Sequence, residues 1–403
     1  MVRDTPTEVE GENSRNSTVE GQNSRTSIAE TTAGTKSTAG ATGSNDSGKD
    51  DSVTEVRPFQ VLSFNAFIRP PIAGMSALRY EWQDQRLTIF SKEYLPKFDL
   101  ILMQEGFQSL NYRMERWVKR WEKYFNLNVV LSKPHSLWGV LTRWERVGDA
   151  GLIIMTKHRV AAQECYEFQC EAHSACMFAG KGVLYALVYP EGSKQGIHVF
   201  NTHLQATYEY KDFDRVSEIR AEQAKEIVQF MKEKVHNNPD PELRNFPVLL
   251  GGDFNENARP KNDLCHRPDE SDANSTPEYV RLIRTLTTFT GKPPVDLLLE
   301  SAKRRGETEH PVTFADTIGP DQDDVCTEMH FYEDKYVLNS RLDYTFVWPG
   351  ASESEDAVYD FDPTKIESSV WEESAKMIFW FQMRQVIDKF LIIQIVNFQF
   401  CSR

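Results

Sequence analysis

Carboxylates, amides and one imidazole recur where apolar stretches of this chain end. The stretch VLLGGDFNEN, residues 248–257, passes from apolar residues into an aspartate and an asparagine two positions apart, and three other apolar runs also end in polar residues. The side chains in question are Asn65, Glu105, His203, Asp253 and Asn255. Oxygen donors of this kind suit Mg²⁺, and an imidazole beside such a metal suits phosphoryl-group stabilisation or proton transfer. If the strands lie side by side, their tips share one rim, and a magnesium site is predicted there.

Each of these side chains has a plainer explanation when it is taken alone. An aspartate at a strand end most often caps a turn or the next helix, and this explanation also applies to Asp149 and Asp343. A lone histidine such as His198 or His203 is most often a structural residue whose hydrogen bonds are satisfied. Only the joint occurrence of such residues at the ends of apolar runs favours a common site.

Short apolar runs must position these side chains. Runs of the buried-strand type cover residues 59–67, 98–107, 148–157, 181–190, 196–206, 246–257 and 340–349. Between them, residues 214–235 carry an apolar stripe with a period of about 3.6, and residues 276–286 begin with Thr276 as a cap followed by Pro277. Residues 86–95 and 111–125 predict two further helices. Because the helices are spread among the strands, an α/β fold with a two-sheet core is expected.

The composition separates a polar N-terminal segment from one large domain. Residues 1–56 are rich in Ser, Thr, Gly, Asn and Glu, so a disordered low-complexity tail is expected, and a regulatory role through phosphorylation is left open. Residues 57–348 carry the apolar runs and fit one catalytic domain. Residues 349–403 form an atypical C-terminal tail. Its apolar part, residues 377–400, is interrupted by charged residues, so it is not expected to span a membrane.

Charge and cysteine content bear on the partners and the compartment. The formal net charge of −14 leaves no basic footprint for nonspecific binding of nucleic acid, so no nucleic-acid partner is expected. The N-terminal stretch MVRDTPTEVE shows no apolar region of a secretory signal. The six cysteines contain no C-x-x-C pair and are expected to be reduced thiols. A cytoplasmic protein is therefore predicted, with peripheral attachment to a membrane left open.

Several motifs resemble, in order, those of the endonuclease/exonuclease/phosphatase superfamily. They are SFNAF, LMQEGF, GLIIMTKHRV, NTHLQA, GGDFNE and RLDYTFV, and the resemblance covers roughly residues 57–348. Within the superfamily, THLQA, IRAEQAKEI, STPEY and KGVLYALV are similar to the neutral sphingomyelinases. The resemblance implies a DNase-I-like, four-layered α/β/β/α sandwich with two mostly antiparallel β-sheets flanked by helices. It also implies Mg²⁺-dependent hydrolysis of sphingomyelin to ceramide and phosphocholine at a membrane surface.

The resemblance also implies roles for the metal-binding and water-activating residues. Glu105 is implied as the principal Mg²⁺ ligand, and Asn65 as a residue that helps to hold the metal or the phosphate. Asp253 is implied to orient or deprotonate the attacking water. His203 is implied to stabilise the charge that develops on the phosphoryl group.

Further roles concern the substrate and the last motif. Asn255 is implied to bind a phosphoryl oxygen, Lys181 to lie near the phosphate, and Asp149 to line the same site. In the family pattern a Ser-Asp-His or similar triplet follows LDY, and its histidine is the acid/base partner oriented by the aspartate that Asp343 matches. No histidine follows His330 in this chain. Loss of a positioned acid/base costs about 10²–10⁴ in rate, so reduced activity is expected.

Two alternatives stay open beside a sphingomyelinase. One is another hydrolase of the superfamily, a nuclease or an inositol-phosphate phosphatase, and the other is a non-catalytic lipid-binding relative. Residues 136–144, SLWGVLTRW, are expected either to contact a bilayer or to lie in the core. The core is expected to lack its final strand, which would leave an edge for the apolar tail to cover.

Overall fold

The computed structural model describes residues 59–68, 83–108, 112–132, 149–169, 179–207, 212–259, 274–315, 339–350 and 365–370, and the backbone of 393–398. All of them belong to one unit of the chain, Glu55–Arg403. The expected N-terminal tail, residues 1–56, lies outside the described residues. So do residues 136–144, which were expected either to contact a bilayer or to lie in the core.

The first six-stranded sheet contains the strand formed by the first apolar run, residues 59–67. Its strand order is β13-β14-β1-β2-β4-β3. The strands are β1 (Phe59–Ile68), β2 (Leu100–Gly106), β3 (Asn128–Leu131), β4 (Ile153–Thr156), β13 (Glu367–Val370) and β14 (Ile393–Phe398). β1 and β2 are parallel, and the other neighbours in this sheet are antiparallel.

A second six-stranded sheet carries the later motifs, in the order β5-β6-β7-β8-β12-β9. Its strands are β5 (Arg159–Glu167), β6 (Gly182–Tyr189), β7 (Ile197–His203), β8 (Val248–Asp253), β9 (Val295–Asp296) and β12 (Asp343–Trp348). Only β7 and β8 are parallel to each other. The short strands β10 (Phe314–Ala315) and β11 (Asn339–Ser340) pair with each other.

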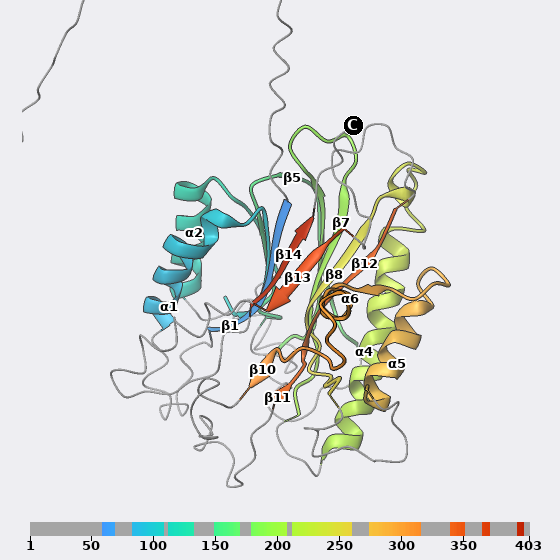
Figure 1. Cartoon of the computed structure of the whole chain (residues 1–403). Coiled ribbons are helices and arrows are strands. Elements are labelled where there is room, and N and C mark those ends of the chain that lie inside the picture. Colours follow the sequence, from blue (N-terminus) through green and yellow to red (C-terminus); the bar gives the residue numbers. More distant parts are fainter. Residues whose placement is uncertain are drawn as a thin grey trace, which may run out of the picture. The chain divides into compact units, whose positions relative to one another are not determined.

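Helices cover the outer faces of the two sheets (Figure 1). The first sheet is covered by α1 (Gln83–Ile89), which continues as the π-helix η2 (Phe90–Tyr94) and the 3₁₀ turn η3 (Leu95–Lys97), and by α2 (Tyr112–Phe125). The second sheet is covered by α4 (Phe213–Lys234) and α5 (Pro277–Thr287). The short helices η6 (Leu243–Asn245) and α6 (Leu297–Arg304) precede β8 and follow β9.

Alternation along the strands assigns their side chains to separate cores. In β2, Leu100 and Leu102 pack in the core between the two sheets, whereas Ile101 and Met103 pack against α1 and α2. In β8, Leu249 packs between the sheets, whereas Leu250 packs in the core beneath α4 and α5. Burial on both faces explains why these strands read as continuous apolar runs. The expected α/β/β/α sandwich is confirmed.

The expected helices agree with the structure except at one place. The helix expected over 214–235 is α4, and the helix expected over 276–286 is α5, where the Thr276 side chain accepts the N–H of Tyr279. The segment expected as a helix over 86–95 is α-helical only to Ile89 and then forms a π-helix and a 3₁₀ turn. β5 was not expected, because it is an edge strand with largely exposed polar residues.

The C-terminal tail supplies strands to the first sheet. β14 pairs antiparallel with β1 from Phe59↔Phe398 to Phe64↔Ile393, and β13 pairs with the other side of β14. The apolar tail was expected to cover an edge of the core, and β14 of the tail does cover the edge of β1. Within the described ranges, no helix combines the length and the apolar composition needed to cross a bilayer.

Candidate active site

Three neighbouring strands of the second sheet end in one row of polar residues. His203 of β7 pairs with Asp253 of β8, and Asp253 pairs with Asp343 of β12. On the other side, His203 pairs with Gly182, which directly follows Lys181. Directly opposed residues project from the same face of a sheet. The register of four strands therefore brings this row together.

Asn65 joins the first sheet to this row. It lies on β1 opposite Gln104 of β2, and Glu105 is the next residue of β2. Its amide nitrogen Nδ2 donates to Oε1 of Glu105 at 2.8 Å and to Oδ2 of Asp253 at 3.0 Å. One amide therefore bridges two carboxylates that come from different sheets.

His203 lies beside both carboxylates. Its Nε2 is 3.6 Å from Oδ2 of Asp253 and 4.0 Å from Oε1 of Glu105. The side chain is almost completely buried. The structure thus brings together Asn65, Glu105, His203 and Asp253, and Asn255 follows in the turn after β8.

The chain that follows Asn65 fixes the orientation of its amide. The backbone N–H of Phe67 donates to Oδ1 of Asn65 at 3.0 Å, so the oxygen faces the backbone and the nitrogen faces the carboxylates. The two terminal nitrogens of Arg86, in α1, donate to the carbonyl oxygens of Ala66 and Phe67, each at 2.8 Å. A guanidinium fork therefore holds the turn that orients Asn65. Direct ligation of a metal by the Asn65 oxygen stays a prediction.

The backbone at the site adopts conformations that are rare outside glycine. φ is +50° at Phe67, +55° at Glu105 and +50° at Asn255. Such residues cost on the order of 1 kcal/mol or more each and persist where their surroundings fix them. At Gly252, φ is +144°, and an added Cβ would lie 2.0 Å from the carbonyl oxygen of Thr202. The residue before Asp253 must therefore be glycine for β8 to lie this close to β7.

Asn255 lies in the turn after β8 and holds Asp253 in place. Its backbone N–H donates to Oδ1 of Asp253 at 2.9 Å, and its Nδ2 donates to the carbonyl oxygen of Leu204 at 3.1 Å. One oxygen of Asp253 is thus engaged by its own turn. The other oxygen, Oδ2, faces Asn65 and His203.

Burial raises the pKa of Asp253. The hydrogen bond from Asn65 and the charge of Lys181 lower the pKa, and the charge of Glu105 raises it. Lys181 is itself only 5% exposed, directly before β6. The structure therefore places Lys181 close enough to act electrostatically on Asp253. A carboxylate with a raised pKa binds a proton more tightly, which suits a general base.

Asp343 is buried opposite Asp253. Burial raises its pKa well above the usual range, and the charge of Asp253 raises it further. The side-chain oxygen of Thr313 accepts the backbone N–H groups of Leu342 at 2.9 Å and of Asp343 at 3.0 Å. In the part of the chain that the structure describes, Oδ1 of Asp343 has no hydrogen-bond partner.

Asp149 supports the segment that carries Glu105. It is fully buried, and its carboxylate accepts the N–H of Gly151 at 2.7 Å and the N–H of Gln108 at 2.9 Å. The N–H of Gly106 in turn donates to the carbonyl oxygen of Gly151 at 2.8 Å. Asp149 therefore ties the chain after β2 to the chain before β4. The implied contact of Asp149 with the substrate stays a prediction.

A buried ion pair below the site was not singled out from the sequence. Arg220 of α4 donates to Glu256 at 2.6 Å and to the hydroxyl of Thr207 at 2.8 Å. It thereby ties the chain after β7 to the chain after β8. Burial raises the pKa of Glu256, although the charge of Arg220 lowers it. The available signal was an arginine four residues after Val216, on the apolar face of α4.

A second buried network lies behind Asp343. Arg341 donates to Asp296 and lies 2.8 Å, through its terminal nitrogen, from Nδ1 of His310. Burial and the charge of Arg341 lower the pKa of His310 to about 3, so its imidazole is neutral at physiological pH. His310 is three residues before Thr313. These contacts join segments that are far apart in the sequence, so no local sequence pattern predicts them.

The donor set fits a hydrated Mg²⁺. Within the described ranges, no group of three His, Cys, Asp or Glu side chains has the arrangement of a metal site. Mg²⁺ is usually held by one or two carboxylates and keeps several waters, so it does not need such a group. The side chains of Glu105 and Asp253 are 15% and 10% exposed and project from two sheets toward one amide. Glu105 is the residue that would hold the ion.

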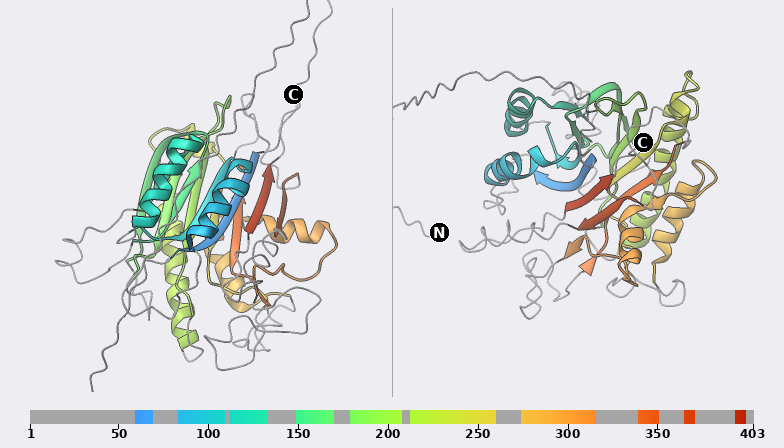
Figure 2. Two further views of the ribbon diagram at one scale, coloured as in Figure 1. Left: turned by 90° about the vertical axis from the view of Figure 1, so that its left-hand side faces the viewer. Right: turned by 45° about the horizontal axis from the view of Figure 1, so that its top comes forward.

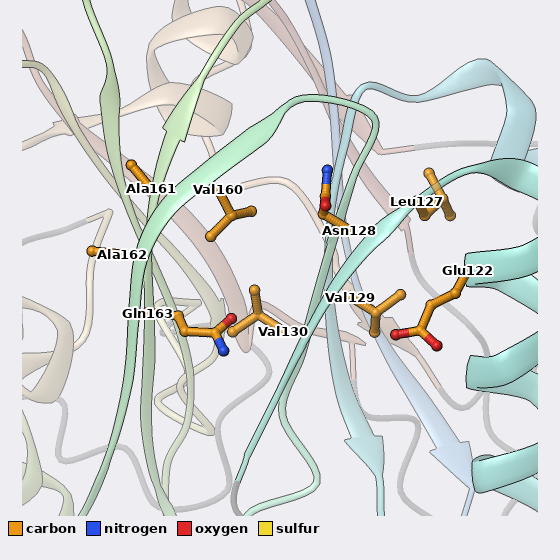
Figure 3. Close-up of a pocket in the computed structure, with 9 residues that line it drawn as sticks. All are labelled: Glu122, Leu127, Asn128, Val129, Val130, Val160, Ala161, Ala162 and Gln163. Carbon is orange, nitrogen blue, oxygen red and sulfur yellow. The ribbon is translucent and has the colours of Figure 1, made fainter.

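A cavity of about 590 Å³ lies between the edge strands β3 and β5 (Figure 3). It is lined by Glu122, Leu127, Asn128, Val129, Val130, Val160, Ala161, Ala162 and Gln163. None of the eight candidate residues lines this cavity. The imidazole of His203 and the carboxyl groups with raised pKa, Asp253 and Asp343, lie at the strand tips. We therefore take the strand tips as the candidate active site.

Comparisons with curated proteins find distant relatives. No family model matches the chain. A sphingomyelinase of Dictyostelium discoideum is 27% identical over 255 residues, which are 56% of this chain and 51% of the relative. A sphingomyelinase C of Bacillus cereus is 26% identical over 215 residues, 51% of this chain and 57% of that protein. A phospholipase C of Staphylococcus aureus is 25% identical over 220 residues, 53% of this chain and 62% of that protein. The chain thus spans little more than half the length of these relatives.

Solved structures support the fold. A sphingomyelinase C from Streptomyces griseocarneus has a TM-score of 0.53 and 15% identity, with 85% of this chain and 99% of that chain covered. A mutant beta toxin from Staphylococcus aureus with bound magnesium ions has a TM-score of 0.54 and 16% identity, with 85% and 100% covered. At these identities the likeness shows the fold alone. The chain is thus similar in sequence to sphingomyelinases and phospholipases C, and it has a DNase-I-like α/β/β/α sandwich fold.

Proposed function

We propose that this chain is a phosphodiesterase that hydrolyses sphingomyelin to ceramide and phosphocholine with the help of Mg²⁺. The observation that carries the proposal is the contact of Asn65 with both Glu105 and Asp253, beside His203. The names of the relatives, sphingomyelinase and phospholipase C, support the substrate class. The magnesium bound to the beta toxin supports the choice of metal.

The first part of the mechanism concerns the attacking water. Glu105 would hold the metal, and Mg²⁺ when bound supplies neutralisation of phosphoryl charge and activation of water. Asp253 accepts the proton of the attacking water through Oδ2, since its other oxygen is held by the N–H of Asn255. Asn65 keeps the two carboxylates in register by donating to both. Little covalent chemistry is required, because catalysis of this kind depends on positioning and electrostatics.

The second part concerns the phosphoryl group. Nε2 of His203 lies within 4.0 Å of both carboxylates, so a phosphodiester bound between them would be in reach of this nitrogen as a donor. The charge of Lys181 acts on the same site, as its effect on the pKa of Asp253 indicates. Asn255 is the nearest amide in the turn after β8 and is proposed to bind a phosphoryl oxygen.

Departure of the ceramide oxygen requires a proton. The family pattern assigns this proton to a histidine after LDY, and none follows His330 in this chain. We therefore expect turnover lower by about 10²–10⁴ than in an enzyme that has the histidine. The unpartnered Oδ1 of Asp343, among the described residues, favours a second candidate function, which is lipid binding without turnover.

The test is a substrate panel with the purified full chain. Release of phosphocholine from sphingomyelin, of nucleotide from DNA and of phosphate from an inositol phosphate would be measured in Mg²⁺, in EDTA and after Mg²⁺ is restored. Metal-dependent release of phosphocholine that is lost in Asp253→Asn is the expected result. Release of nucleotide or inorganic phosphate instead would identify another hydrolase. Binding of sphingomyelin vesicles with no turnover of any substrate would identify the lipid-binding alternative.

A further inference from the structure

The helix α2 has an apolar inner face and a basic outer face. Its buried residues are Met114, Trp117, Val118 and Trp121, which pack on the first sheet. With about 3.6 residues per turn, Arg116, Lys119, Arg120 and Lys123 lie with Tyr112 in one arc of about 100°, on the side of the helix opposite the buried residues. We call these five residues the α2 outer face. Figure 2 shows α1 and α2 in front of the first sheet, with no described element outside them.

Among the described residues, Lys119 alone of the four cations of this face forms an ion pair with a carboxylate. Lys119 pairs with Glu115 at 2.6 Å. Within the described part of the chain, no carboxylate forms an ion pair with Arg116, Arg120 or Lys123. The Arg120 guanidinium lies over the Trp117 ring, and the Lys123 ammonium lies over the Tyr124 ring. These two cations are thus held against aromatic rings and keep their positive charge.

Two tyrosines lie exposed on the same helix. Tyr112 is 82% exposed and Tyr124 is 69% exposed. Among the described residues, they are two of the three large hydrophobic side chains that are exposed, and the third is Val280. Tyrosine has an apolar ring and a polar tip, and it is favoured where a protein meets the interfacial region of a bilayer. Basic residues flanked by exposed tyrosines are typical of a membrane-contact surface.

The opposite helical layer lacks this pattern. α2 carries five basic and two acidic residues, whereas α4 carries five of each. On α4 the charges pair with one another, as Lys225 does with Glu222 and Lys234 with Glu233. The whole chain has a formal net charge of −14. A basic helix in such a chain makes one face attractive to anions while the rest repels them.

We propose that the α2 outer face is a docking surface for anionic phospholipid headgroups. Charge complementarity identifies this occupant, and the choice of a lipid surface rests on the proposed function at a phosphodiester lipid. A flat bilayer contacts one face only, so the acidic remainder of the chain stays in solvent. A nucleic acid is the less favoured occupant, because its charge extends along the strand past the acidic surfaces as well.

The position of α2 connects this surface to the candidate site. Tyr112, at the start of α2, is seven residues after Glu105, at the end of β2. The basic face therefore begins close along the chain to the strand tips and extends away from them over the length of the helix. Docking through α2 is a contact separate from the binding of the scissile headgroup, so the two can be measured independently.

The experiment compares two charge-matched variants of the full chain in vesicle co-sedimentation. Arg116→Gln/Arg120→Gln/Lys123→Gln removes three cations from the α2 outer face. Arg215→Gln/Lys225→Gln/Arg284→Gln removes three exposed cations from α4 and α5. Vesicles contain phosphatidylcholine with or without about one third phosphatidylserine, and EDTA is present so that turnover plays no part. Circular dichroism confirms that both variants are folded.

The proposal predicts that the wild-type chain binds the anionic vesicles and that high salt weakens this binding. A basic residue near an anionic surface contributes roughly fivefold to partition, so the α2 variant should bind on the order of a hundredfold more weakly. The α4/α5 variant should bind like the wild type. Equal loss in both variants, no loss in the α2 variant, or α2-dependent binding of an oligonucleotide in place of vesicles would overturn the proposal.

A further measurement separates this proposal from the proposed function. Hydrolysis of sphingomyelin in neutral detergent micelles does not require an anionic surface, so the α2 variant should retain the wild-type rate there. If the wild-type chain binds anionic vesicles through α2 but hydrolyses nothing, the proposed function fails and the docking surface stands. If it hydrolyses micellar sphingomyelin but ignores anionic vesicles, the docking surface fails and the proposed function stands.

Discussion

The amide nitrogen of Asn65 lies 3.0 Å from Oδ2 of Asp253, a contact between residues that are 188 positions apart in the chain. Asn65 belongs to the first sheet and Asp253 to the second. The same nitrogen also donates to Glu105. The site is therefore assembled where the tips of the two sheets meet, and its geometry depends on how the sandwich closes.

The first prediction concerns Asn65→Ala. Without the bridging amide, the Glu105 and Asp253 carboxylates lose the donor that they share, and their positions relative to the metal become less defined. Loss of a group that orients metal ligands typically costs 10- to 100-fold in metal affinity or activity. We expect the Mg²⁺ concentration for half-maximal phosphocholine release to rise by about that factor. Asn237→Ala, at an exposed position, is the control, and an unchanged Mg²⁺ requirement in Asn65→Ala would contradict the prediction.

The second prediction concerns Arg86→Gln. Arg86 contacts neither carboxylate in the hydrogen bonds described above, and it holds the carbonyl oxygens of Ala66 and Phe67 behind Asn65. We expect about a tenfold weaker response to Mg²⁺, because the turn that orients the Asn65 amide loses two charge-assisted hydrogen bonds.

Arg86→Lys serves as the second variant, since an ammonium cannot donate to both carbonyls in the geometry of a guanidinium fork. Lys92→Gln, at an exposed position of the same helical segment, is the control. If all three variants titrate with Mg²⁺ like the wild type, Arg86 has no part in positioning Asn65.

Much of this arrangement follows from the sequence, for a physical reason. β2 and β8 are buried on both faces, so LILM and VLL read as strands, and the polar residues after them mark the strand tips. β5 was not predicted, because RVAAQECYE forms an exposed edge strand and burial therefore imposes no pattern on its sequence. β14 was not predicted as a strand, because its partner β1 lies at the other end of the domain sequence and local spacing does not reveal such a pairing.

At the candidate site, too, the sequence predicts some features and not others. Strand ends locate Glu105, His203 and Asp253, but they do not reveal which way an amide or a carboxylate turns. The Asn65 oxygen faces the N–H of Phe67, and the Asp149 carboxylate faces two backbone N–H groups. These orientations depend on left-handed turns and on partners from other segments, which no local spacing encodes.

The third prediction is a metal-dependent gain in thermal stability. A cation that binds only the folded protein stabilises it by about 2.7 kcal/mol at a hundred times its dissociation constant. Mg²⁺ should therefore raise the Tm of the wild-type chain in a calorimetric scan, and it should not raise that of Glu105→Gln. Glu218→Gln, an exposed control on α4, should respond like the wild type. An equal rise in Glu105→Gln would mean that the ion binds elsewhere.

The fourth prediction concerns Asp343→Asn and pH. Burial and Asp253 raise the pKa of Asp343 in the folded state, so between the unfolded pKa of about 3.9 and the raised value the folded state binds more protons than the unfolded state. The contribution of Asp343 to the free energy of unfolding therefore falls as pH rises through this window. The variant has no carboxyl to ionise in this window, so at pH 7 in EDTA we expect it to be more stable than the wild type.

Urea unfolding at several pH values between 4 and 7 measures this difference. The advantage of Asp343→Asn should shrink toward pH 4, because the wild-type carboxyl is then protonated in the folded state and about half protonated in the unfolded state. Asp240→Asn, at an exposed position, should show no such trend. A variant that is less stable than the wild type at pH 7 would show that the Asp343 carboxylate is stabilised in the fold, against the direction of its pKa.

The last prediction concerns the buried pair of Arg220 and Glu256, which joins the chain after β7 to the chain after β8. Removal of one partner leaves the other charge buried and uncompensated, so Arg220→Met should lower the free energy of unfolding by about 3–5 kcal/mol. Glu256→Gln should cost less, because a neutral amide oxygen can still accept from Arg220. The double variant Arg220→Met/Glu256→Gln should recover part of the loss, since no charge is left buried, and a urea-unfolding cycle measures the coupling.

Because the Arg220 guanidinium also donates to Thr207, four residues after His203, both Arg220→Met variants should have lower activity even under conditions where they are fully folded. Additive effects in the cycle would mean that the two side chains are stabilised independently and that the pair does not hold the two segments together.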